Sequence, residues 1–190
     1  MKRVGLMGLG VLVIALASLT LLGSGWDPEK ESLKKETAAV DRTIASFRHD
    51  HPRLEVYFRE AHAWAVFPTI GTGGAVVSGA YGKGQVYEKG KLVGRAETKK
   101  AGLGLTIGGG TYSELLFFRD KEALDRFTNG DLKFEAGAKV VAIKGGAATE
   151  SSWNEGVAVF LRSKKGLMAD ASVSGQAFTF QGLSTARTSK

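Results

Sequence analysis

Residues 63–94 read AWAVFPTIGTGGAVVSGAYGKGQVYEKGKLVG, and this stretch decides the fold class. Its glycines stand between β-branched and aromatic residues, which are the residue types that favour strands. The chain contains 26 Gly in 190 residues, about twice the usual share of roughly 7%. They follow no G-x-y period, so they exclude collagen and indicate tight hairpins and kinks in a small, strongly curved sheet. We predict that Pro68 ends the opening segment, that short strands break at Gly82-Lys83-Gly84, and that Lys89-Gly90 forms a hairpin turn.

The strand pattern continues beyond this stretch. Residues 101–110 and 111–120 predict two further strands. The second is apolar on both faces from Leu115 to Phe118, so we expect it to be buried on both sides. The glycines of the first, Gly102-Leu103-Gly104 and Gly108-Gly109-Gly110, resemble a phosphate-binding loop. Such a loop needs a helix directly after it, whereas a strand follows these glycines and no G-K-[ST] occurs, so we interpret them as structural.

One helix interrupts the strands. Asp120 is the expected N-cap of a helix over residues 121–130, which ends at Asn-Gly. Residues 131–142 alternate between apolar and polar side chains, as a half-buried strand does. Residues 156–180 predict two more strands joined across residues 163–166.

Two helices are predicted before the sheet. Asp27-Pro28 opens the first, since Asp is favoured at the N-cap and Pro at the first helical position, and Pro52 ends it. The second, shorter helix covers residues 53–63. The first helix carries one apolar stripe at helical spacing, made of Leu33, Val40, Ile44 and Phe47.

That stripe has two interpretations. It packs on the core of the domain, or it forms an interfacial lipid-binding face beside which Lys34 and Arg48 extend towards the head groups. Together the segments predict an α+β domain. Its N-terminal helices pack on a curved, mainly antiparallel, Gly-rich β-sheet or barrel with one inserted helix.

The first residues have the layout of a bacterial export signal. Lys2 and Arg3 precede an apolar run from Val4 to Leu22, and small residues allow cleavage after Ala17. The run is also long enough to be retained as an anchor, and both possibilities stay open. We therefore divide the chain into an export signal or anchor (1–26), a helical region (27–62), a β-rich domain (63–180) and a flexible tail (181–190), and expect a location in the periplasm or cell envelope.

The charge balance favours an anionic partner. The formal net charge is +7 and the sequence pI is near 9.6, which suits anionic lipid head groups or other envelope polyanions in an exported domain. Nucleic acid is not an expected partner in that compartment. The candidate lipid-binding residues are Lys34, Arg48, Lys89, Lys91, Arg95, Lys99, Lys100, Lys164 and Lys165, with Arg162 beside the last two.

Three blocks in a fixed order resemble the SYLF, or Ysc84-type, family. Residues 63–94 are similar to its opening signature, with the AVFP element and the paired Gly-Tyr-Gly and Lys-Gly turns. Residues 101–138 resemble its second block, and residues 163–180 its closing hairpin. The resemblance implies a lipid-binding module, known in eukaryotes for engaging phosphoinositide membranes and, in some members, actin. Actin is not carried over to an exported bacterial protein.

The sequence carries no recognisable catalytic or cofactor motif. His49 and His51 flank Asp50, but no further ligands at metal-site spacing accompany them. No G-x-S-x-G elbow is present, and the chain has no Cys. We therefore predict a non-catalytic protein without metal or cofactor. The alternatives are an envelope scaffold without specific lipid binding, a small outer-membrane barrel, which needs longer strands than these, and an enzyme.

Overall fold

The computed structural model describes residues 28–73, 78–102, 110–132, 134, 153–163, 166–168 and 175–183. Helix α1 spans Pro28–Asp50 and is followed by the 3₁₀ turn η1 (Pro52–Leu54) and helix α2 (Glu55–Glu60). The remaining elements are β1 (Ala63–Gly73), β2 (Ser78–Glu88), β3 (Lys91–Gly102), β4 (Gly110–Phe118), α3 (Lys121–Thr128), β5 (Val157–Ser163), β6 (Gly166–Met168) and β7 (Gln176–Gly182).

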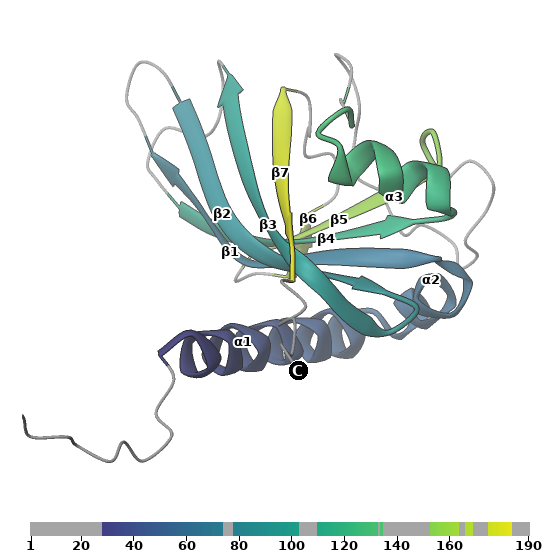
Figure 1. The fold of residues 1–190 in the computed structure, drawn as a ribbon, viewed down its shortest axis with the longest axis horizontal. Helices are drawn as coiled ribbons and strands as arrows, with labels where there is room; N and C mark the ends of the chain where they lie inside the picture. The colour runs from purple at the N-terminus through teal and green to yellow at the C-terminus, as the bar shows by residue number, and fades with distance from the viewer. Residues whose placement is uncertain are drawn as a thin grey trace, which may run out of the picture.

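The described strands form one sheet in the order β6-β5-β4-β1-β2-β3-β7. Every pairing in it is antiparallel. The sheet is open, with β6 and β7 at its two edges, and it curves strongly (Figure 1). The α+β class and the antiparallel sheet are confirmed, and of the two predicted forms the open sheet is the one observed.

Helices cover both faces of the sheet. Helices α1 and α2 lie against one face, which we call the outer face, and α3 lies inside the curve on the inner face (Figure 1). Each face has its own apolar core. The outer core contains Val40, Phe47, Leu54, Tyr57, Phe58, Val66, Leu115, Phe117, Ala158 and Phe160. The inner core is built around Phe67, Ile70, Leu116, Phe118, Leu124, Phe127, Leu132, Val159 and Phe178. Leu115 to Phe118 are thus buried on both sides, as predicted.

The apolar stripe of α1 faces the core. Val40 and Phe47 are buried against the sheet and Ile44 packs beside them, so the interfacial-face interpretation is wrong. Acidic residues in the first turn and basic residues in the last complement the helix dipole. The helix ends at Asp50, before Pro52, as predicted.

The strand breaks predicted at Pro68 and at Gly82-Lys83-Gly84 are wrong. Strand β1 continues through Pro68 because a bulge lies there. The register of β1 shifts at this point against both of its neighbours, β2 and β4, and proline is tolerated at a bulge. Strand β2 runs unbroken through both glycines. They are needed for close approach: a Cβ on Gly82 would lie 2.6 Å from Cγ1 of Ile70, and one on Gly84 would overlap the carbonyl oxygen of Val66.

Two local predictions are confirmed. Lys89 and Gly90 join β2 and β3 in a tight turn, with φ angles of 49° and 79°, as type I′ hairpins require. Asp120 caps α3, and its carboxylate accepts a hydrogen bond from the amide of Ala123 at 2.9 Å.

Other boundaries differ from the prediction. The predicted helix over 53–63 is a 3₁₀ turn and a single short helix that ends at Glu60. The closing segment forms three strands, β5, β6 and β7, instead of two. Of the predicted strand over 131–142, Asp131, Leu132 and Phe134 are described and are not in a strand, Leu132 and Phe134 being buried, and the other residues lie outside the described ranges.

The predicted export segment, residues 1–26, and most of the tail also lie outside the described ranges, as do Leu103 to Gly109. Among the helices that are described, none combines the length and apolar character needed to cross a bilayer.

Candidate functional site

A partly open groove of about 980 Å³ lies between the N-terminal half of α1 and the outer face of the sheet. Strands β1, β2, β3 and β7 form its floor and far wall. Its volume is at the upper end of the range of roughly 300–1,000 Å³ that is usual for ligand pockets. Its apolar lining on the outer face comes from Ala39, Val40 and Pro68.

Two periodicities place the polar side chains of the groove. Glu29, Ser32 and Glu36 recur at helical spacing, so they share one side of α1. In β2 and β3 alternate residues share a face, which brings Lys83 and Arg95 to the outer side of the sheet. The lining therefore combines side chains that lie far apart in the sequence.

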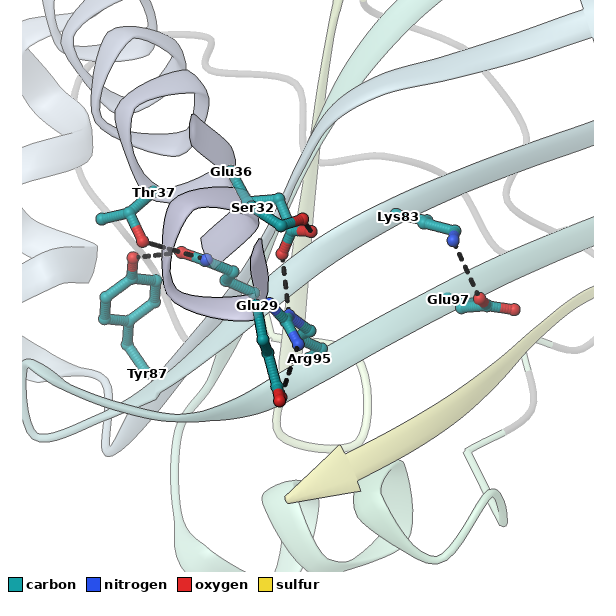
Figure 2. A network of polar contacts seen from close by, with 9 residues as sticks. Glu29, Ser32, Glu36, Thr37, Lys83, Tyr87, Arg95 and Glu97 are labelled. Carbon is teal, nitrogen blue, oxygen red and sulfur yellow. Dashed lines mark hydrogen bonds and ion pairs between the residues drawn. The ribbon is translucent and has the colours of Figure 1, made fainter. Parts of the chain in front are cut away.

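Figure 2 shows the ion pairs that connect α1 to the sheet. Nε of Arg95 donates a hydrogen bond to Oε2 of Glu36 at 2.8 Å, and Nη1 of Arg95 lies 3.9 Å from Glu29. Nζ of Lys83 lies 3.8 Å from Glu97 in the neighbouring strand. With three carboxylates against two cations among the lining residues, the groove is close to neutral.

A neutral hydrogen-bonded chain lies deeper, between α1 and β2. Nε2 of the buried Gln85 donates to Oγ1 of Thr37 at 3.1 Å, and the hydroxyl of Tyr87 donates to Oε1 of Gln85 at 2.7 Å (Figure 2). Burial, and then the negative charge of Asp41, raises the pKa of Tyr87 to about 12. The phenol therefore stays protonated at neutral pH and keeps its role as donor.

The open side of the groove presents an exposed tyrosine with two lysines. Tyr81 is 44% exposed and is paired with Lys99 in the β2–β3 ladder. Lys83 lies two residues further along β2, on the same face. We call Tyr81, Lys83 and Lys99 the rim.

The predicted basic candidates do not form one surface. Lys99 belongs to the rim and Arg95 lies in the groove, whereas Lys100 points to the inner face. Lys89 and Lys91 are exposed at the opposite end of the β2–β3 hairpin.

The remaining candidates lie elsewhere. Lys34 is exposed on α1. Arg48 pairs with Glu55 at 3.0 Å and its guanidinium lies 4.3 Å from the ring centre of Phe58, so it joins α1 to α2. Arg162 pairs with Asp50 at 2.6 Å. Lys164 and Lys165 lie outside the described residues.

A second polar cluster, absent from the sequence prediction, lies on the inner face. Glu114 is fully buried, and its Oε2 accepts a hydrogen bond from Nε2 of Gln176 at 2.5 Å. The same Nε2 lies 2.8 Å from Oγ1 of Thr98. Oε1 of Glu114 has no hydrogen-bond partner among the described residues. This cluster connects β4 to β7, which are not neighbours in the sheet.

Burial controls the ionisation of this cluster. It raises the pKa of Glu114 to about 7, against the opposing effects of the Gln176 hydrogen bond and the positive charge of Lys100. Burial also lowers the pKa of Lys100 and, together with the charge of Glu114, raises the pKa of Tyr112. The sequence does contain a signal for the cluster. Glu114 stands two and four residues before the inward-facing Leu116 and Phe118, so strand alternation places it on the same inner face.

All three histidines lie in the part of the chain that the structure describes. His62 lies 2.7 Å from Glu88 across the β1–β2 pair, and Asp50, between His49 and His51, is bound to Arg162. No group of three or more His, Asp or Glu side chains placed to hold a metal occurs within the described ranges.

Comparison with known proteins gives two matches. Residues 99–187 match the family model described as "Ysc84: Las17-binding protein actin regulator". Beta cell expansion factor A of Aeromonas veronii is 28% identical over 158 residues, which cover 78% of this chain and 57% of the relative. The matched region thus spans little more than half of that relative's length.

Proposed function

We propose that this chain, which matches the Ysc84-type (SYLF) family model over residues 99–187, binds anionic membrane lipid reversibly and without catalysis. Similarity to this family is consistent with binding of lipid or with actin-related binding. The words "Las17-binding" and "actin regulator" describe other members of the family. Features of this chain's own surface favour the lipid.

The observation that carries the proposal is the rim beside the groove. Tyrosine has an apolar ring and a polar tip, which suits the boundary between head groups and acyl chains. Lys83 and Lys99 lie on the same face and are both exposed. Each lysine near an anionic surface contributes about 1 kcal/mol of attraction. The groove behind the rim has the size of a ligand pocket and an apolar part to its lining.

The site of action follows from the first residues of the sequence. A positively charged start and an apolar run favour export, so we propose that the domain works at the cell envelope, where anionic lipid is abundant. In that setting the N-terminal run, cleaved or retained, directs the domain across the membrane, and the rim then contacts the lipid surface.

Removing the two rim lysines tests the assignment. We expect Lys83→Gln with Lys99→Gln to weaken partitioning onto anionic vesicles roughly 30-fold, the equivalent of about 2 kcal/mol. The matched control is Lys89→Gln with Lys91→Gln, which removes the same charge from the other end of the hairpin and is expected to have a much smaller effect. Vesicle co-sedimentation at low salt measures both, and thermal melts check that both variants stay folded.

The control also separates the alternatives. If the Lys89 and Lys91 changes weaken binding more than the rim changes, the hairpin turn is the membrane-facing surface and the rim assignment is wrong. If neither the parent nor any variant prefers anionic over neutral vesicles, the envelope scaffold is the better account of the protein.

A further inference from the structure

Arg95 occupies an unusual position in the groove. Its side chain is 29% exposed and lies between the sheet and two carboxylates of α1 (Figure 2). A guanidinium has five N–H donors. Among the contacts within the described residues, only Nε–H donates a hydrogen bond, to Glu36. Glu29 lies 3.9 Å from Nη1, which is an ion pair beyond hydrogen-bond distance. The terminal amino groups therefore keep donor capacity at the wall of the groove.

We propose that the guanidinium of Arg95 binds the phosphate of an anionic lipid in the groove, and that Glu36 is an internal competitor for it. This inference rests on the proposed lipid-binding function and names the residues that select the head group. The planar fork of arginine matches the oxygens of a phosphate and can hold two of them at once. A phosphate would use the terminal amino groups and weaken the Nε contact with Glu36.

The lining of the groove favours a lipid over free phosphate. Ala39 and Pro68 supply apolar surface in the same groove as Arg95, and about 980 Å³ is far more space than a phosphate alone would need. An acyl chain or glycerol backbone removed from water there gains the usual stabilisation of apolar burial. The phosphate would then lie at Arg95, with Lys83 nearby in the same groove.

The competition is local, because α1 is held to the sheet elsewhere. Val40 and Phe47 are buried in the outer core, and Thr37 keeps its hydrogen bond to Gln85 when Glu36 moves away. Only one helical turn needs to release its ion pair. Removing the charge of Glu36 should therefore raise affinity without unfolding the helix.

Calorimetric titration of the full chain with dihexanoyl phosphatidic acid, below its micelle concentration, tests the proposal. We expect Glu36→Gln to bind about tenfold more tightly than the parent, since a competing charge-assisted contact is removed. The matched control is Glu122→Gln on the exposed side of α3, which changes the net charge equally and should leave affinity unchanged. Arg95→Lys keeps the charge but loses the fork, and should bind about tenfold more weakly.

Two further titrations identify the ligand. Dihexanoyl phosphatidylcholine and inorganic phosphate should each bind much more weakly than phosphatidic acid. Equal affinity of the Glu36→Gln and Glu122→Gln variants for phosphatidic acid would overturn the proposal, as would equally tight binding of inorganic phosphate, which would make the groove a simple anion site. Failure here with intact binding to anionic vesicles would refute the Arg95 assignment alone, whereas loss of vesicle binding would refute the proposed function itself.

Discussion

Replacing Glu114 with glutamine is expected to remove about 3 kcal/mol of pH-dependent instability from the protein. Burial holds the pKa of this carboxyl at about 7 in the folded state, against 4.5 for a glutamate in water. Between these two values the folded protein binds a proton that the unfolded chain has released. The contribution of this proton to the free energy of unfolding is therefore fully present below about pH 4.5 and is lost as the pH rises through 7. It amounts to roughly 1.4 kcal/mol for each unit of pKa difference.

The measurement is the free energy of unfolding in urea at pH 5 and pH 8, for the parent and for Glu114→Gln. The parent should lose about 2.5 kcal/mol more than the variant between the two conditions, because a part of the effect lies below pH 5. Other titrating groups are common to both proteins and cancel in the comparison. Glu97→Gln, a change at a partly exposed carboxylate, is the control and should follow the parent. Identical pH profiles for the parent and Glu114→Gln would show that Glu114 is not a buried, proton-binding acid.

The second large effect is expected at Gly84. A Cβ at this position would overlap the carbonyl oxygen of Val66 and would lie 2.7 Å from Cδ1 of Phe67. Both atoms belong to the central strand β1, which cannot move without disturbing its neighbours on either side. Gly84→Ala should therefore destabilise the fold by about 3 kcal/mol, at the upper end of the usual cost of overpacking.

Gly71 provides the matched control for this change. It lies in the same sheet, but a Cβ built on it meets nothing within 4 Å, so Gly71→Ala should stay within about 0.5 kcal/mol of the parent. Urea unfolding of the two variants gives the comparison. Equal midpoints would mean that β1 and β2 do not approach each other as closely at Gly84 as described.

Local sequence signals predicted most of the elements correctly. Three features depend only on residues that are close together in the chain, so the sequence predicts them directly. They are the proline at the start of α1, the Lys89-Gly90 turn and the Asp120 cap. The strand through Pro68 could not be recognised, because the bulge that accommodates the proline is a property of three paired strands. Gly82 was interpreted as a strand break for the same reason, because its close approach to Ile70 in β1 is a tertiary contact.

The candidate site was less predictable than the fold. Arg95 was identified as a basic candidate, but its partner Glu36 is 59 residues away along the chain, and no local pattern connects them. Lys99 and Lys100 were identified together as candidates, but they lie on opposite faces, because adjacent residues in a strand point to opposite sides. Glu114 stands in an otherwise apolar strand, and alternation alone would have placed it inside the sheet.

The most direct test of the proposed function is vesicle flotation of the full chain at two salt concentrations. Comparing anionic with neutral vesicles removes any contribution from the apolar N-terminal run, which both kinds of vesicle would take up equally. We expect binding to anionic vesicles to exceed binding to neutral ones at 0.1 M salt, where the Debye length is about 10 Å, and the difference to shrink at 1 M, where it is about 3 Å. Equal flotation with both kinds of vesicle at both salt concentrations would contradict the claim that this chain binds anionic lipid.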